Sequence, residues 1–75
     1  MTKIEQRYLT AARELVALDM LDAAARVIAS IHRSTRRRAT QAAALKLVVE
    51  LGLVDRVTMH NNCLVHVADV SAVRS

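Results

Sequence analysis

The chain contains few of the residue types that restrict or specialise a protein structure. Its 75 residues include one glycine, one cysteine, one aromatic residue (Tyr8) and no proline. A single cysteine cannot form an intrachain disulfide, and no Cys and His pairs fall at zinc-finger spacing. One glycine is too few for a Gly-rich phosphate-binding loop. One aromatic ring argues against single-strand binding and against an RNA-recognition sheet, since both usually stack bases on several rings.

Long hydrophobic runs are also missing. Charged residues interrupt every apolar run before it reaches the ~20 residues of a membrane span. The N-terminus lacks the apolar core of a signal peptide. We therefore expect a cytoplasmic protein with no membrane contact.

The length predicts a single domain, residues 1–75, because so short a chain can enclose only one core. The hydrophobic fraction is 53%, which is more apolar side chain than a domain of this size can bury alone. A partner subunit commonly covers such excess apolar surface, so we expect a homodimer. No cofactor is expected.

Positive charge is concentrated in the middle of the chain. The formal net charge is +4, and the pI is about 10.2. No acidic residue occurs between Asp22 and Glu50, whereas six basic residues do: Arg26, Arg33, Arg36, Arg37, Arg38 and Lys46. A field of one sign favours a polyanionic partner, and the lack of aromatic rings makes duplex the better candidate than single strands. The alternative is an ordinary solvated basic face.

The first helix is predicted over residues 3–18. Thr2 and Glu5 have the spacing of a capping box, in which each side chain binds a free amide at the helix start. Apolar residues recur at helical spacing and are expected to form the core face; they are Ile4, Tyr8, Ala11, Ala12, Leu15 and Leu18.

A second helix is predicted over residues 22–33, with Asp19 or Asp22 as its N-cap. Its inward residues are expected to be Ala24, Val27, Ile28 and Ile31. No glycine or proline marks the break before it, so one long helix through this point is an alternative.

A third helix is predicted over residues 39–51, with Gly52 as its C-cap. Its start has two interpretations: a cap at Ser34 or Thr35 with three arginines in the first turn, or a second helix that continues through Arg37 with Thr40 as the cap. We expect one core stripe of Ala44, Leu45, Val48 and Leu51. Leu47 and Val49 lie off this stripe, which suggests contact with another chain.

The last segment is predicted to be a β-hairpin over residues 56–68. Two registers are possible. A two-residue turn, Asn61 and Asn62, pairs Val57 with His66 and Met59 with Leu64, whereas a three-residue loop, Asn61 to Cys63, pairs Met59 with Val65 and Val57 with Val67. This register places all four apolar residues on one face, so it is preferred. Residues 70–75 are expected to fray. The predicted fold class is therefore mainly α with a C-terminal β-hairpin.

Catalysis and metal binding have little support. His32, His60, Cys63 and His66 lack the spacing of a metal site, so surface histidines and no metal are expected. No Asp or Asn is placed to orient a Cys and His pair, and so small a domain rarely encloses a substrate pocket. The chain is not expected to be an enzyme.

The stretch from Arg38 to Val54, RATQAAALKLVVELGLV, resembles the recognition helix of bacterial winged helix-turn-helix regulators of the GntR and MarR type. The resemblance covers about a quarter of the chain, and the rest only in the order of elements. It implies three helices plus a wing, and a small transcriptional regulator or repressor that binds duplex DNA. It also implies base-edge contacts from Thr40 and Gln41, and wing-tip contacts from Asn61 and Asn62. Phosphate contacts are implied for Arg36, Arg37, Arg38 and Lys46, and the neighbouring Arg33 is included in the predicted site.

The chain departs from this family at several positions. Ala42 and Ala43 stand where polar or basic residues usually follow the threonine, and Leu47 and Val49 replace a generally charged surface. These residues leave little capacity to read bases. A second hypothesis is therefore a small interaction protein of the phage or plasmid type, an anti-defence factor that inhibits a host protein or nucleoprotein complex.

Overall fold

The computed structural model describes residues 2–73 as a mainly helical chain with a small antiparallel hairpin. Its elements are α1 (Lys3–Ala17), α2 (Leu21–Ser34), α3 (Arg38–Glu50), the short 3-10 helix η1 (Val54–Arg56), β1 (Val57–His60), β2 (Cys63–His66) and α4 (Val67–Val73). The three predicted helices are confirmed to within one residue at each end. The predicted fraying of the tail is wrong as far as residue 73, because α4 begins directly after the hairpin; residues 74 and 75 lie outside the described residues.

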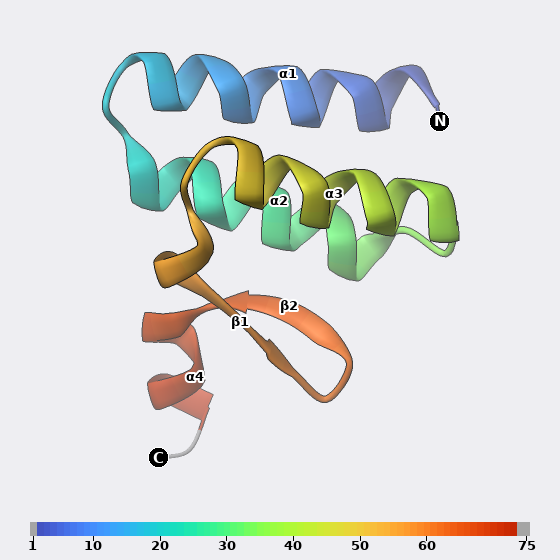
Figure 1. Cartoon of the computed structure of the whole chain (residues 1–75). Helices are drawn as coiled ribbons and strands as arrows, with labels where there is room; N and C mark the ends of the chain where they lie inside the picture. The colour runs from blue at the N-terminus through green and yellow to red at the C-terminus, as the bar shows by residue number, and fades with distance from the viewer. Residues whose placement is uncertain (1, 74–75) are drawn as a thin grey trace.

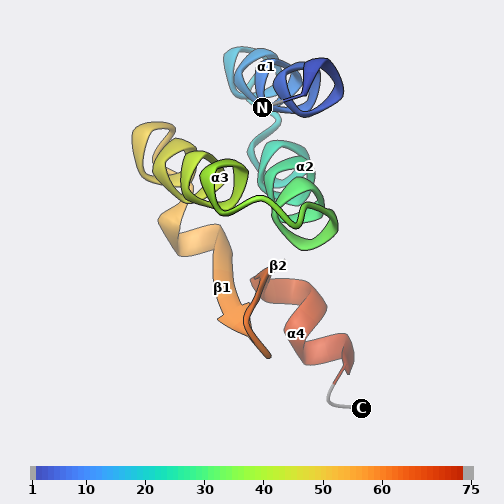
Figure 2. The same cartoon turned by 90° about the vertical axis from the view of Figure 1, so that its right-hand side faces the viewer.

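α2 is the central element of the fold. It contacts α1 on one side, α3 on another and strand β2 on a third. Figure 1 shows α1 above α2 and α3, with the hairpin and α4 below them. The quarter turn in Figure 2 shows α1, α2 and α3 end on, as the corners of a triangle. No helix within residues 2–73 has the length and apolar character needed to cross a bilayer.

The start of α1 is the predicted capping box. The Glu5 amide donates to the Thr2 hydroxyl at 3.2 Å, and the Thr2 amide donates to the Glu5 carboxylate at 3.0 Å. These bonds satisfy amides that have no partner inside the helix. The local pattern alone therefore fixes where α1 begins.

A chain reversal separates α1 from α2, which excludes the single long helix. Asp19 adopts a left-handed conformation with φ 60°. The Met20 amide donates to the Leu15 carbonyl and the Asp19 amide to the Val16 carbonyl, as in a Schellman motif. Neither predicted aspartate caps α2, because its N-cap is Met20, which makes no side-chain cap bond. Asp19 instead takes the place that glycine usually occupies at a helix end.

The buried face of α1 is the predicted one only in part, because Ala12 is buried and Leu15 packs against the core as expected. Glu5 and Ala12 are buried, with Leu9 and Val16 packed against the core, whereas Ile4 and Tyr8 are exposed. α1 thus carries two apolar stripes at helical spacing, and only one of them faces α2. Periodicity identifies a stripe but cannot choose between two.

The buried face of α3 also differs from the predicted one. Leu47 is buried and Leu45 is 40% exposed, the reverse of the prediction, and Val49 is exposed as expected. The buried face is formed by Thr40, Ala44, Leu47 and Val48. The outer face of α3, which we define as Arg38, Ala42, Leu45, Lys46 and Val49, faces solvent.

The predicted C-cap role of Gly52 is confirmed. Gly52 has φ 68°, its amide donates to the Val49 carbonyl, and the Leu53 amide donates to the Val48 carbonyl. This second Schellman motif turns the chain so that Leu53 is fully buried. The end of α3 is therefore both stopped and anchored to the core.

The hairpin has the register that was not preferred. Val57 pairs with His66, Met59 with Leu64 and His60 with Cys63, so the turn contains only Asn61 and Asn62. Both asparagines have positive φ, 52° and 64°, as the two central residues of a type I′ turn require. The turn chemistry therefore decided the register.

The buried face of the hairpin includes a polar residue, which is why the argument from apolar alternation failed. Leu64 and His66 are buried. The His66 ring accepts the Ala68 amide at Nδ1 (3.1 Å) and donates from Nε2 to Asp22 at 2.8 Å. A buried polar ring is tolerated when both nitrogens are satisfied. These bonds also connect β2 to α2 and to the first turn of α4.

His32 is also buried, so the expectation of surface histidines is wrong for His32 and His66; His60 is half-buried. The Leu64 amide donates to His32 Nδ1 at 3.4 Å. Burial lowers the pKa of His32 below its usual value because the apolar surroundings disfavour the charged ring. The neutral ring can accept this bond, whereas a protonated ring could not.

We expect Gly52→Ala to lower the free energy of unfolding by about 1 kcal/mol, because a side chain makes the left-handed conformation costly. A Cβ at this position would meet no atom within 4 Å, so the cost is conformational rather than steric. Gly52→Asn should cost less, since asparagine adopts this conformation more readily. Denaturant unfolding of the three proteins measures the difference, and equal stability would contradict the role of Gly52.

Candidate nucleic-acid interface

Three helix ends meet on one side of the protein. The start of α1, the end of α2 and the start of α3 lie together (Figure 1), and the Thr35 hydroxyl donates to Glu5 at 2.6 Å across them. We call this region the cationic end; its basic residues are Lys3, Arg7, Arg33, Arg36, Arg37 and Arg38. Figure 2 looks onto this end of the three helices.

All six side chains of the cationic end are exposed. None of them makes an ion pair within residues 2–73. The remaining basic side chains in that range behave differently, because Arg13, Arg26 and Arg56 each pair with a carboxylate and only Lys46 does not. Unpaired positive charge is therefore collected at one end of the molecule.

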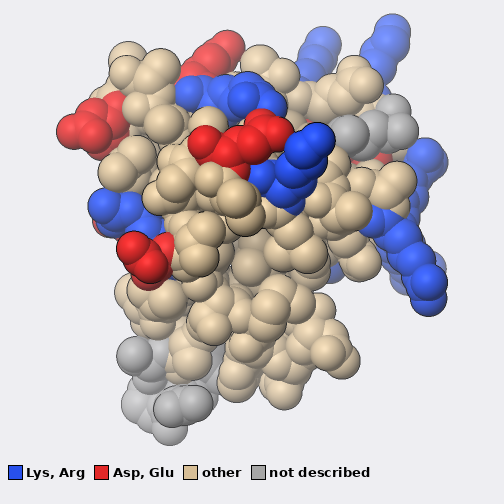
Figure 3. All heavy atoms as spheres, viewed as in Figure 1, with Lys and Arg blue, Asp and Glu red and all other residues tan. Residues whose placement is uncertain are grey.

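Figure 3 shows one face: Lys and Arg side chains project from the right-hand end, while Asp and Glu lie toward the left and the centre with other Lys and Arg side chains beside them. The acidic partners Asp22 and Asp69 bind Arg56 at 2.9 Å and Arg26 at 3.6 Å. Glu50, at the end of α3, binds Arg13 at 3.0 Å. Since exposed pairs of this kind contribute little to stability, their main effect is to neutralise charge away from the cationic end.

Glu5 is the acidic residue of the cationic end, and hydroxyl groups satisfy it rather than guanidinium groups. Its carboxylate accepts from the Thr2 amide (3.0 Å), the Thr2 hydroxyl (3.2 Å) and the Thr35 hydroxyl. The Thr35 oxygen in turn accepts the Arg37 amide at 3.2 Å. A buried carboxylate thus holds the backbone that carries the arginines.

These hydrogen bonds lower the pKa of Glu5 to about 2, with the Thr2 amide contributing most and the Thr35 hydroxyl next. Burial opposes the shift but is outweighed. The carboxylate is therefore ionised at neutral pH, as its role as a pure acceptor requires. Thr40 contributes a smaller lowering, although its hydroxyl makes no bond within normal hydrogen-bond geometry.

The start of α3 matches neither predicted interpretation. α2 ends at Ser34 and α3 begins at Arg38, with Arg37 as an N-cap that makes no side-chain cap bond. The first turn of α3 contains no acidic residue. Uncapped amides and the positive end of the helix dipole therefore lie next to three arginines, an arrangement that favours an anion.

The two residues predicted to contact base edges, Thr40 and Gln41, are directed toward the protein rather than toward solvent. Thr40 is 0% exposed, so the predicted base-edge contact from its side chain does not fit the structure. Gln41 is half-buried, and its side-chain amide nitrogen, Nε2, donates to the Thr35 carbonyl at 3.4 Å. Gln41 therefore supports the connection between α2 and α3. Neither residue is presented as a base reader.

The other predicted contacts are exposed but separate. Lys46 lies on the outer face of α3, two turns beyond Arg38. Asn61 and Asn62 form the exposed hairpin turn, which points toward the same side as the cationic end in Figure 1. The structure thus brings Arg33, Arg36, Arg37 and Arg38 together, with Lys46 and the turn at a distance.

Sequence reasoning missed four residues of this region. Lys3 and Arg7 join it because α1 begins at this end, and Glu5 and Thr35 order it. The capping-box pattern could have placed Lys3 at a helix start. No local pattern could have paired Glu5 with Thr35, because 30 residues separate them.

No group of three or more His, Cys, Asp or Glu side chains suited to a metal ion occurs among the residues that the structure describes. Cys63 is half-buried and forms no disulfide there. The histidines His32 and His66 serve as hydrogen-bond partners in the core.

Comparisons of the chain with protein-family models, with curated proteins and with solved structures give no match.

We expect the contribution of Glu5 to stability to be complete above its unfolded pKa of about 4.5 and to be lost as the pH falls toward about 2. The sign follows from a pKa that is lower in the folded state, since the unfolded chain then binds more protons over this range. Glu5→Gln keeps the capping-box geometry and removes the charge. Urea unfolding at several pH values should show a stability gap between wild type and variant that narrows across the window.

Thr35→Val tests the same contact from the other side. It removes the hydroxyl that donates at 2.6 Å, so the wild-type pH dependence in this range should become weaker. A wild type and a Glu5→Gln variant that lose stability in parallel from pH 4.5 to 2 would show that another group is responsible.

Proposed function

We propose that this chain binds duplex DNA, with the cationic end against the phosphate backbone. The observation that carries the proposal is the collection of six exposed basic side chains without ion pairs in the described residues. Leaving them unpaired costs repulsion, which a polyanion relieves. Phosphate oxygens match the bidentate geometry of arginine, and the uncapped start of α3 adds amide donors.

The proposed architecture is a winged helix. Three helices precede a two-stranded hairpin, and only residues 35–37 connect α2 to α3. The hairpin turn points toward the side of the cationic end (Figure 1), where a wing could approach the backbone. This arrangement agrees with the resemblance of residues 38–54 to GntR and MarR recognition helices.

In this proposal α3 positions the protein rather than reading sequence. Its outer face offers Arg38 and Lys46, separated by Ala42 and Leu45, so few side chains there can address base edges. Phosphate contacts fix register without reading sequence. We infer a small regulator or repressor whose binding depends mainly on charge and on the shape of the duplex.

Replacing Arg36, Arg37 and Arg38 together by alanine should weaken duplex binding by about tenfold or more for each contact, because bonds to charged groups contribute about 1.5–3 kcal/mol each. The slope of log affinity against log salt should fall by about 2.7, since each phosphate contact contributes about 0.9. Fluorescence anisotropy with a labelled duplex over a salt titration measures both quantities.

The matched control replaces Arg13, Arg26 and Arg56, the three ion-paired arginines. Both triple variants lower the formal net charge from +4 to +1, and circular dichroism verifies that each remains folded. Affinity should fall mainly in the first variant. Equal losses in the two would mean that binding follows net charge alone, and unchanged affinity in the first would reject the cationic end as the site.

A second candidate function rests on the apolar part of the outer face of α3. Leu45 is 40% exposed and Val49 68% exposed, although a helix that enters a DNA groove is usually polar there. A small inhibitor that binds a host protein would use such a surface, with the cationic end meeting acidic residues of its partner.

Affinity capture from a nuclease-treated bacterial lysate separates the two functions. A protein partner should be retained in stoichiometric amount by the wild type and lost with the Leu45→Ser, Val49→Ser double variant, if the second function holds. Retention of DNA from an untreated lysate, unaffected by that variant and with no stoichiometric protein, would instead support the first.

A further inference from the structure

We propose that a second copy of this chain docks antiparallel against the outer face of α1, with Ala11 at the centre of the contact. This inference does not depend on DNA binding, and it assigns Arg7 of the cationic end to the contact between copies, which leaves the other five basic side chains of that end to a ligand. It rests on an exposed apolar stripe and on the order of charges beside it.

The stripe is formed by residues at helical spacing along the whole length of α1. Ile4 is 66% exposed, Tyr8 46% and Leu18 70%, while Ala11 and Leu15 between them are half-buried. The core already receives Leu9, Ala12 and Val16 from α1, and Leu15 at the edge of the outer stripe also packs against it. Apolar side chains repeated on a second face of one helix are typical of a contact surface.

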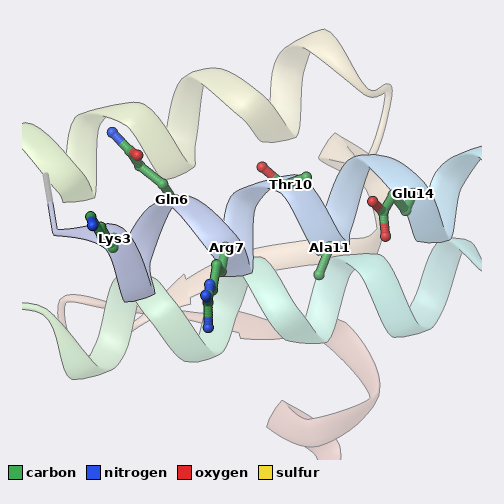
Figure 4. A pocket seen from close by; sticks show the side chains of 6 residues that line it. All are labelled: Lys3, Gln6, Arg7, Thr10, Ala11 and Glu14. Atoms are coloured by element: carbon green, nitrogen blue, oxygen red, sulfur yellow. The ribbon is translucent and has the colours of Figure 1, made fainter.

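Charges of opposite sign flank this stripe at its two halves. Figure 4 shows a shallow hollow on the surface of α1, lined by Lys3, Gln6, Arg7, Thr10, Ala11 and Glu14. The basic residues Lys3 and Arg7 belong to the first half of the helix and Glu14 to the second half. None of these three forms an ion pair within residues 2–73.

A twofold axis through Ala11 makes this face complementary to itself. In an antiparallel pair, residues equally far before and after position 11 lie opposite one another. Arg7, four residues before Ala11, then lies within one residue of the level of Glu14 of the second copy, which is three residues after it, and the same contact recurs on the other side of the axis. Ile4 likewise lies beside Leu18 of the second copy. A parallel pair would place Lys3 and Arg7 against their own counterparts, so charge selects the antiparallel arrangement.

The shape of α1 also suits a close approach. Ala11 has the smallest side chain of the stripe, so the helix axes can come near each other at the centre. Beside it, a second hollow lined by Ile4, Arg7, Tyr8 and Ala11 can receive a side chain of the second copy. Small residues at a helix crossing with larger ones on either side give interlocking contact.

The outer face of α3 does not offer the same self-complementarity. Its charged residues are Arg38 and Lys46, and the nearby Glu50 is already paired with Arg13 at 3.0 Å. Two copies meeting through this face would bring like charges together. A second copy is therefore the better occupant for α1 than for α3.

The contact is modest in size. α1 has 15 residues and is about 22 Å long at 1.5 Å per residue. Interfaces of one helix pair fall below the usual size of permanent complexes, so we expect a dimer that dissociates on dilution.

The test measures self-association by sedimentation equilibrium over a range of protein concentrations, for the wild type and for variants in which charges on α1 are reversed. Arg7→Glu and Glu14→Arg should each weaken self-association about tenfold, because attraction becomes repulsion at both symmetric contacts. The double variant R7E/E14R restores opposite charges at both contacts and should recover most of the wild-type affinity. Ile4→Ser with Leu18→Ser should abolish self-association, and circular dichroism verifies that every variant is folded.

Lys46→Glu is the matched control, because it changes the net charge as Arg7→Glu does but lies on α3. It should leave self-association unchanged. A wild type that is monomeric at every concentration would overturn the proposal. The proposal would also be overturned if neither single charge reversal weakened self-association, or if Lys46→Glu weakened it as much as they do. The same holds if the double variant R7E/E14R self-associated as weakly as the single variants.

Discussion

The hydrogen bond from the Thr35 hydroxyl to the Glu5 carboxylate is the contact on which the arrangement of the cationic end depends. It joins the start of α1 to the connection between α2 and α3 at 2.6 Å. A carboxylate placed among arginines would ordinarily form a salt bridge with one of them. Here hydroxyl and amide donors occupy it, so it fixes the backbone of residues 35–37 while the guanidinium groups stay exposed. Structural anchoring and the proposed ligand binding are thereby assigned to different side chains.

The same separation of roles extends along the molecule. Away from the cationic end, acidic residues pair with Arg13, Arg26 and Arg56 and join elements distant in sequence. Asp22 alone receives Arg56 from η1 and His66 from β2, so one carboxylate in the first turn of α2 holds the hairpin. These contacts lower the pKa of Asp22, with the His66 bond the largest cause and the Arg56 bond next. One end of the molecule uses its charges internally, and the other presents them to solvent.

Local sequence signals predicted the helices well, whereas the buried faces, which were predicted only in part, and the hairpin register, which was predicted wrongly, depend on non-local contacts. The capping box of Thr2 and Glu5, and Gly52 after α3, mark helix ends through bonds within a few residues, so their positions could be read directly. The buried face of α1 could be predicted only in part, because two stripes have the same period and only the position of α2 distinguishes them. The prediction of the hairpin register was wrong because the buried His66 is satisfied by a hydrogen bond to Asp22, which lies 44 residues earlier in the chain. The exposed arginines were predicted, whereas the burial of Thr40 depends on how α3 packs.

The burial of Thr40 and the bond from Gln41 to Thr35 bear directly on what the third helix can recognise. Both side chains are directed to the interior or to the chain connection, so the start of α3 retains only arginines and backbone amides for a ligand. Such groups recognise phosphate well and bases poorly. Discrimination between DNA sequences would then have to come from duplex shape, from the hairpin turn, or from the spacing of two cationic ends. The proposed antiparallel α1 pair would set that spacing, because it would carry the two ends to opposite sides of the shared axis. The dimer geometry would then contribute to specificity where the helix itself cannot.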